Sequence, residues 1–187
     1  MIQAQKNVDK WISTFVYEKH LCGGILKEGG IILRVNIYIE TDNGSRKKMY
    51  RGYGALVEFY RKNGQPETRE TYGCCYGTWN LAYITALKDG LGLLTKPCTV
   101  AISASNKYVC ESLCNGRVKE WQKNGWYTIK GQPIANTDEW RELLKVAAGH
   151  EFEFMYHSKS SYSSYMQNKI KSAKNQNGNW QQTQIIG

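Results

Sequence analysis

Hydrophobic and polar side chains alternate from Val35 to Ile39, as they do along a half-buried β-strand. A second alternating segment covers Tyr53–Tyr60, and a third covers Glu67–Cys74. Between the second and third segments, Asn63-Gly64 is typical of a tight hairpin turn, because both residues tolerate positive φ. From Ile31 onward, the pattern therefore predicts three antiparallel strands joined by short connections.

The spacing changes after the third strand. Ile84, Leu87, Leu91 and Leu94 recur at helical intervals, which predicts a helix over 78–94. Seven shorter segments are then predicted: strand Cys98–Ser103, helix Asn106–Cys114 capped by Ser105, helix Arg117–Lys123, loop Asn124–Ala135, a helix capped by Asn136 or Thr137, strand Phe152–Tyr156, and a last helix through Tyr162, Met166 and Ile170. The order β-β-β-α-β-α-α-α-β-α predicts an α/β fold. Its five-stranded mixed sheet has three antiparallel strands followed by two further strands, with helices on both faces.

The 187 residues fit one globular domain with short additions at both ends. Residues 1–30 are interpreted as an N-terminal extension of unknown role, with helical spacing between Val8 and Phe15, and residues 31–173 as the domain. Residues 174–187 are rich in Asn and Gln, which predicts a polar, flexible tail. Because no apolar stretch has the length of a membrane span and Met1–Lys10 lacks the apolar core of a signal peptide, we expect a cytoplasmic location.

The chain carries 25 Lys and Arg residues against 16 Asp and Glu residues, a formal net charge of +9. Such an excess favours a polyanionic partner, with nucleic acid as the first candidate. A basic solvated surface without a nucleic-acid role is the competing interpretation. The 23 aromatic residues (6 Trp, 13 Tyr and 4 Phe) supply enough core material to exclude a wholly disordered chain.

Six segments, in order, carry a resemblance to a known family. They are Val35-Asn36-Ile37-Tyr38, Gly52-Tyr53-Gly54-Ala55, Leu81–Leu87, Ser103-x-Ser105-x-Lys107-Tyr108-Val109, the aromatic run Trp121-x3-Gly125-Trp126 with Gly131-x-Pro133-Ile134-x-Asn136-x3-Trp140, and His157 before the last helix. In this order they resemble ribonuclease H of the bacterial type, over about Val35 to Ala173. The resemblance implies a ribonuclease H-like fold in which the aromatic run forms a helix-loop-helix handle, the basic protrusion of that family.

The resemblance also implies a chemistry, which is cleavage of the RNA strand of an RNA–DNA hybrid by two divalent cations held by four carboxylates. At the four matching positions this chain has Glu40, with Asp42 two residues later, and then Trp79, Ser105 and Gln167. No Asp or Glu lies between residues 70 and 89, between 89 and 111, or after 153. Three of the four carboxylate windows are therefore empty in any register, and only Glu40 and Asp42 remain as weak metal ligands.

We expect this chemistry to be impaired or lost, with no cofactor firmly predicted and Mg²⁺ or Mn²⁺ required if the domain is active. Three interpretations stay open. The first is a degenerate domain that binds nucleic acid. The second is an active ribonuclease H with a rearranged ligand set, in which His157 could serve as a base or assist product and proton traffic. The third is a protein-interaction module, favoured if Trp79 fills the cleft.

Nucleic acid, as an RNA–DNA hybrid or another duplex, is the expected partner, and a protein partner is the alternative. Cationic side chains would contact phosphates without reading sequence. Trp121 and Trp126 would contact sugars or form the core of the handle. In the family, Asn residues before the first helix contact RNA hydroxyls, whereas the matching stretch Cys75–Thr78 has no side-chain amide and Thr78 keeps a hydroxyl. The candidate contacts are Arg46, Lys47, Lys48, Arg51, Thr78, Lys119, Trp121, Lys123, Trp126, Lys130, Lys159 and Lys169.

Overall fold

The computed structural model describes residues 24–27, 30–157 and 159–184. The strands are β1 (Gly24–Lys27), β2 (Gly30–Thr41), β3 (Met49–Tyr60), β4 (Pro66–Gly77), β5 (Cys98–Ala104) and β6 (Glu151–Tyr156). The helices are α2 (Trp79–Leu91), α3 (Lys107–Cys114), α4 (Arg117–Lys123), α5 (Thr137–Ala147) and α6 (Ser163–Gln184). The element order from β2 to α6 is the order that the hydrophobic pattern predicts.

The strands form one mixed sheet in the order β4-β3-β2-β5-β6. The pairs β2–β3 and β3–β4 are antiparallel, whereas β2–β5 and β5–β6 are parallel. This arrangement confirms the predicted α/β fold with its five-stranded mixed sheet. The short strand β1 adds an antiparallel partner to β2 within the stretch assigned to the N-terminal extension. The helical spacing between Val8 and Phe15 lies outside the described residues.

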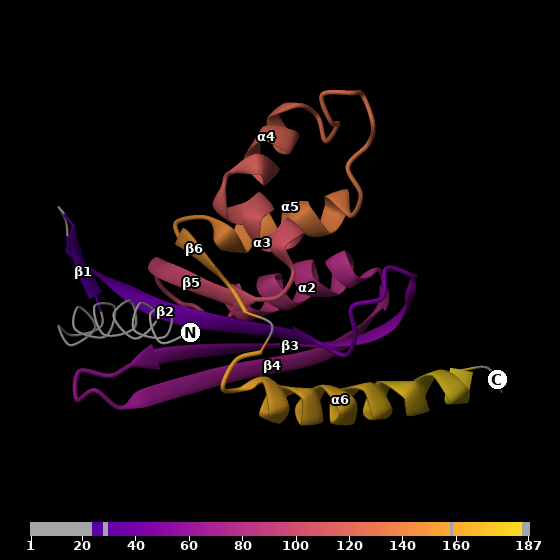
Figure 1. The fold of residues 1–187 in the computed structure, drawn as a ribbon, viewed down its shortest axis with the longest axis horizontal. Coiled ribbons are helices and arrows are strands. Elements are labelled where there is room, and N and C mark those ends of the chain that lie inside the picture. The colour runs from indigo at the N-terminus through magenta and orange to yellow at the C-terminus, as the bar shows by residue number, and fades with distance from the viewer. Residues whose placement is uncertain (1–23, 28–29, 158, 185–187) are drawn as a thin grey trace, which may run out of the picture.

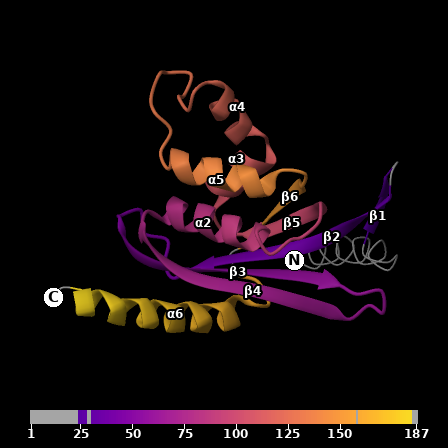
Figure 2. The same cartoon turned by 180° about the vertical axis from the view of Figure 1, so that it is seen from behind.

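Helices cover both faces of the sheet, as Figures 1 and 2 show. On one face, α2 packs against β2 and β3, and α5 packs against α2. The side chains of Val35, Ile37 and Ile39 point into this layer and are buried, so the predicted alternation of β2 is confirmed. On the other face, α6 runs along β3 and β4. The sheet is therefore sandwiched between two helical layers.

Two glycines of β3 let α6 approach the sheet closely. A Cβ at Gly52 would lie 2.5 Å from Ile170 Cγ2, and one at Gly54 would lie 2.5 Å from the ring of Tyr72 and 3.4 Å from Ile170 Cγ1. Ile170 and Met166 are buried in this contact. Within the stretch predicted from the sequence as a polar, flexible tail, residues 174–184 continue the helix α6.

Side chains cap the starts of α2 and α3. Thr78 caps α2 through a hydrogen bond from the Leu81 amide (3.3 Å), and Asn106, not Ser105, caps α3 by accepting from the Val109 amide (3.1 Å). Asn106 also donates to Asn80 (2.9 Å), so its amide joins α2 to α3. Asn136 takes the N-cap position of α5, as predicted, but its side chain makes no cap hydrogen bond, and the Thr137 hydroxyl donates to the Ile134 carbonyl instead (2.6 Å). Among the described helices, none combines the length and the apolar character that crossing a membrane requires.

Candidate functional site

The four positions that the resemblance assigns to carboxylates converge at the carboxyl ends of β2 and β5. Tyr38 of β2 pairs with Ser103 of β5, so Glu40 and Ser105 each lie two residues beyond that pair, at the same end of the sheet. Trp79 opens α2 and donates from Nε1 to Thr41 Oγ1 (3.1 Å). Gln167 of α6 reaches Glu40 from the opposite face of the sheet. We call these four residues the Glu40 corner: Glu40, Trp79, Ser105 and Gln167.

The carboxylate of Glu40 is held by neutral hydrogen-bond donors. Gln167 Nε2 donates to Glu40 Oε2 (3.1 Å) and to the backbone carbonyl of Thr41 (2.9 Å). The hydroxyl of Ser163 donates to Glu40 Oε1. These donors occupy lone pairs that a cation would otherwise use, so Glu40 is satisfied within the protein. Sequence reasoning missed Ser163, although its spacing of four residues from Gln167 places both on one helix face.

Asp42 is neutralised by a different group. The backbone amide of Asp42 donates to the Gly52 carbonyl (3.0 Å), so the chain stays paired with β3 past the end of β2. Its carboxylate then forms an ion pair with Lys174 of α6 (2.6 Å) and is largely buried. Glu40 and Asp42 thus share the α6 face, as the alternation predicts, but each has its own partner. Sequence reasoning missed Lys174 as the partner of Asp42, because 132 residues separate the two positions.

The other two positions of the corner carry no carboxylate and are tied to Tyr83. The indole of Trp79 packs edge-on against Tyr83, with ring centroids 5.4 Å apart. The hydroxyls of Tyr83 and Ser105 are 2.7 Å apart, and the Ser105 amide also donates to Tyr83 (3.4 Å). Burial raises the pKa of Tyr83 to about 12, so its phenol stays protonated at neutral pH. The half-buried Trp79 thus belongs to a packed polar and aromatic cluster.

These donors do not fit a pair of divalent cations. In residues 24–27, 30–157 and 159–184, no three His, Cys, Asp or Glu side chains gather in a way that could hold a metal ion. Mg²⁺ prefers several oxygen ligands in octahedral geometry, and the corner offers one carboxylate engaged with an amide and a hydroxyl. The corner therefore does not fit the two-cation site that the resemblance implies.

His157 lies beside the corner at the end of β6. Its backbone amide donates to the carbonyl of Ala104 (3.1 Å), the residue before Ser105, and its side chain is exposed. The structure therefore brings His157 to the same sheet end as the corner.

Of the four cations predicted to contact phosphates from the first hairpin loop, three are exposed and one is buried. Arg46, Lys47 and Lys48 are exposed, whereas Arg51 is fully buried, so the assignment of Arg51 to phosphate contacts is corrected. Its guanidinium donates to the carbonyl oxygens of Asn43 (3.0 Å), Ser45, Lys47 (2.7 Å) and Gly77 (3.1 Å). Arg51 therefore fixes the path of the loop that carries the exposed cations.

The handle, residues 117–140, has an aromatic interior and cations outside. Trp121 and Trp126 are buried, and Trp121 packs edge-on against Trp140 with centroids 5.7 Å apart. Both tryptophans thus take the alternative role that the sequence left open, as core of the handle. The exposed cations in and near the handle and at the start of α6 are Lys119, Lys123, Lys130 and Lys159, and Lys169 is exposed but 3.4 Å from Glu70. Thr78 is engaged as the cap of α2.

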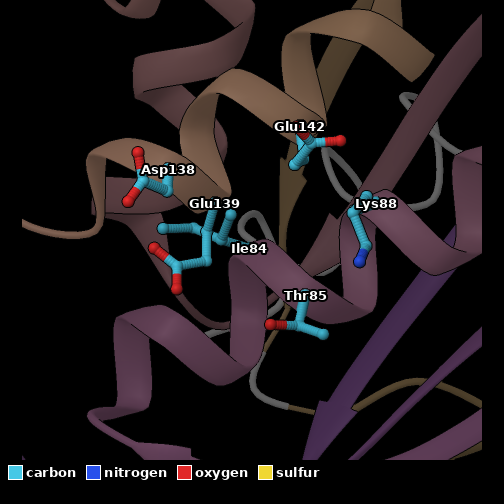
Figure 3. Close-up of a pocket in the computed structure, with 6 residues that line it drawn as sticks. All are labelled: Ile84, Thr85, Lys88, Asp138, Glu139 and Glu142. Carbon is cyan, nitrogen blue, oxygen red and sulfur yellow. The ribbon is translucent and has the colours of Figure 1, made fainter.

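A separate pocket of about 150 Å³ lies between α2 and α5 (Figure 3). It is lined by Ile84, Thr85, Lys88, Asp138, Glu139 and Glu142, none of which belongs to the predicted site. Two of its three carboxylates are already paired, Asp138 with Arg141 (2.8 Å) and Glu142 with Lys145 (2.6 Å). Because its rim is acidic, this pocket repels phosphate, and the Glu40 corner with the cationic loop and handle remains the candidate site.

Comparison with known proteins assigns the family. The RNase H family model matches residues 34–160, so the chain belongs to the RNase H family. Ribonuclease H of Moorella thermoacetica is 40% identical over 105 residues, which cover 56% of this chain and 66% of that protein. Ribonuclease H of Zymomonas mobilis is 34% identical over 121 residues, covering 64% and 74%. This chain spans less than two thirds of the length of several of these relatives. It covers 61% of ribonuclease H of Pelobacter propionicus, for example.

Solved structures support the fold. LC9-RNase H1, a type 1 RNase H with the type 2 active-site motif, aligns with a TM-score of 0.62 at 21% identity, covering 75% of this chain and 72% of that chain. The foamy viral protease-reverse transcriptase solved in complex with an RNA/DNA hybrid aligns with a TM-score of 0.55 at 15% identity, covering 75% of this chain and 19% of that one. At these identities the likeness concerns the fold alone.

Proposed function

We propose that this RNase H-family domain binds nucleic-acid duplexes, with RNA–DNA hybrid as the first candidate, and that its metal-dependent hydrolysis is impaired or lost. One observation carries the proposal: Glu40, the carboxylate left in the corner, accepts hydrogen bonds from Gln167 and Ser163, while the other three positions of the corner are Trp79, Ser105 and Gln167. A two-metal mechanism needs several carboxylates to place both ions against the scissile phosphate. The corner lacks them.

The binding half of the proposal is supported by charge. Exposed cations lie on the first hairpin loop and on the handle, and the chain carries a net charge of +9. Replacing carboxylates by Trp79, Ser105 and Gln167 also removes negative charge that would repel phosphate in the absence of a metal. The foamy viral enzyme of the same fold was solved with an RNA/DNA hybrid and also with dsDNA, which makes duplexes the first ligands to test.

The test uses one set of samples for binding and for cleavage. The full chain is mixed with a hybrid labelled on the RNA strand, with Mg²⁺, with Mn²⁺ or with a chelator, and Glu40→Gln is run in parallel as the matched variant. We expect salt-sensitive binding in every condition, no metal-dependent cleavage, and the same affinity for the variant within about twofold. Cleavage that requires metal and disappears in Glu40→Gln would overturn the loss of hydrolysis. Absence of binding at low salt would overturn the whole proposal.

A working ribonuclease H is the second candidate, and it is favoured by the relatives. A protein named ribonuclease H is 40% identical over more than half of this chain. Activity would require Gln167 and Ser163 to release Glu40 and Lys174 to release Asp42, so that both carboxylates face one ion. Under this candidate, Lys174→Ala should increase metal-dependent cleavage because it frees Asp42. Under the first proposal the same variant stays inactive.

A further inference from the structure

An isoleucine stands fully exposed at the apex of the handle. The connection from α4 to α5 projects away from the sheet at the top of Figure 1. Within it, we call residues 126–134 the finger. Ile129 at its tip has an exposed fraction of 101%, and Tyr127 beside it is 52% exposed. Exposure of a single aliphatic side chain is common by itself, so the shape of the finger and the charge around it decide what Ile129 can contact.

Hydrogen bonds hold the finger in one shape. At its base, Tyr127 and Pro133 form an antiparallel bridge, and the Ile134 amide donates to the Trp126 carbonyl (2.9 Å). Nearer the tip, the Thr128 amide donates to the Gln132 carbonyl (2.8 Å), and the Gln132 amide donates to Thr128 Oγ1 (3.0 Å). The finger is therefore a narrow hairpin that carries Ile129 at its turn.

The base of the finger is anchored in the handle. Trp126 is buried in a left-handed backbone conformation with φ 69°, which costs energy for a residue other than glycine and persists only where its surroundings fix it. The guanidinium of Arg141 lies over its ring, 5.3 Å from the centroid. Ile134, at the other end of the finger, is buried as well. The tip is thus held before any ligand arrives, which lowers the entropy cost of binding.

The charge around the finger favours a polyanion over an apolar protein pocket. From Trp121 to Thr137 the sequence contains no Asp or Glu, and it contains Lys123 and Lys130. Both lysines are exposed, and within the described part of the chain no ion pair joins either of them to a carboxylate. A rigid apolar tip next to Lys130, on a connection that begins at Lys123 and carries no carboxylate, fits a groove lined by phosphates.

We propose that Ile129 is an apolar wedge that enters a groove of the bound duplex and partly unstacks a base step, while Lys123 and Lys130 contact the flanking phosphates. This inference rests on the proposed function and names how the handle contacts the duplex. In proteins that insert an aliphatic side chain between base steps, the free-energy cost of unstacking is offset by the additional contacts that the kinked duplex makes with the protein. Ile129, at the turn of the finger, is an aliphatic side chain of the kind that such an insertion requires.

The test places the fluorescent base 2-aminopurine in the DNA strand of a hybrid, at successive positions, because its emission rises when it is unstacked. We expect the wild-type chain to raise emission at one or two adjacent positions. Ile129→Ser should abolish this rise and weaken binding about tenfold, as expected for the loss of one buried aliphatic contact. Ile129→Leu, which keeps an apolar tip, should retain both. Because Ile129 is fully exposed, the thermal midpoint of Ile129→Ser should equal that of the wild type.

A second variant separates the wedge from the phosphate contact. Lys130→Gln should weaken binding and reduce the slope of log K against log salt by about 0.9, while the emission of bound hybrid still rises. Wild-type binding without any change in emission, or an Ile129→Ser variant that matches the wild type in affinity and emission, would overturn the wedge and leave the proposed function standing. The exposed tip would then fit an apolar pocket of a protein partner. No binding by the wild type would overturn both proposals.

Discussion

The Glu40 corner and the handle belong to the same domain, yet they direct their polar groups in opposite ways. In the corner, Glu40 is turned toward hydrogen-bond donors of α6, and Asp42 beside it is paired with Lys174 of the same helix. In the handle, aromatic rings fill the interior and Lys119, Lys123 and Lys130 face outward. The corner is closed by internal bonds, whereas the cations of the handle remain available to a ligand. The cations of the handle are therefore exposed, whereas the carboxylates at and beside the corner are satisfied within the protein.

This difference shows which interactions define the fold. The buried core of β2, β3, β5, α2 and α5 is apolar, and it does not include the side chain of Glu40 or of Gln167. Exchanging carboxylates in the corner for neutral or aromatic residues therefore leaves the main core intact. Hence the polar residues of the corner can be changed by mutation without dismantling the sheet, whereas Trp79 packs against the core.

The largest effect should come from rebuilding the corner. Trp79→Glu, Ser105→Asp and Gln167→Asp together supply carboxylates at the three empty positions and free Glu40 from the Gln167 amide. We expect Mg²⁺-dependent cleavage of a labelled hybrid to rise by at least about a hundredfold over the wild type, because two cations can then be held. Gel analysis of cleavage over time measures the rate. Adding Glu40→Gln to the triple variant should remove the gain, and a wild-type rate equal to that of the triple variant would contradict this prediction.

The second largest effect should come from a bulky residue placed in β3 under α6, which should destabilise the fold. Gly52→Val places a branched side chain where a Cβ already meets Ile170 at 2.5 Å, so α6 must move away from β3. We expect a loss of about 1–3 kcal/mol in the free energy of unfolding, measured by urea denaturation. The control is Gly92→Ala, since Gly92 has helical φ and its added Cβ would meet backbone oxygens at an ordinary 3.4 Å. A Gly52→Val variant as stable as this control would show that α6 is not closely packed on the sheet.

Neutralising the handle should change binding without changing stability. Lys119→Gln, Lys123→Gln and Lys130→Gln together remove three exposed cations. If each contacts a phosphate, the salt slope of hybrid binding falls by about 2.7, or 0.9 for each contact. Fluorescence anisotropy over a salt series measures the slope. Lys62→Gln, in the exposed β3–β4 turn, serves as the single-charge control and should leave the slope unchanged. An unchanged slope in the triple variant would move the interface away from the handle.

The smallest effect concerns the buried phenol of the corner. Burial raises the pKa of Tyr83 from 10.0 to about 12, so the folded protein holds this proton more tightly than the unfolded chain does. The corresponding stabilisation is complete below pH 10 and is lost as the pH rises toward about 12. Over this pH range, the free energy of unfolding of Tyr83→Phe should therefore fall less steeply with pH than that of the wild type. Urea denaturation at a series of pH values measures both. Tyr127→Phe, at an exposed ring, should follow the wild type, and parallel curves for all three proteins would refute the prediction.

Much of the fold was predictable because local periodicity reports it directly. The alternation in Val35–Ile39 and the helical spacing from Ile84 to Leu91 arise from which side of each element is buried. The emptiness of the three carboxylate windows is likewise a property of the sequence, since no register can supply an acid that is absent. Sequence therefore determined the α/β order, the mixed sheet and the chemical character of the corner.

Tertiary structure decided how individual polar side chains are used. The sequence predicts Arg51 to be one more exposed cation of a basic loop. In the structure its guanidinium is buried, because it donates to the carbonyl oxygens of Gly77 and Lys47. Lys174 and Gln167 reach Asp42 and Glu40 across 132 and 127 residues of sequence, which no local pattern reports. The exposure of Ile129 also depends on the finger standing clear of the domain. Partners distant in the chain set burial and pairing, so these roles emerged only once the sheet, α6 and the handle were placed in space.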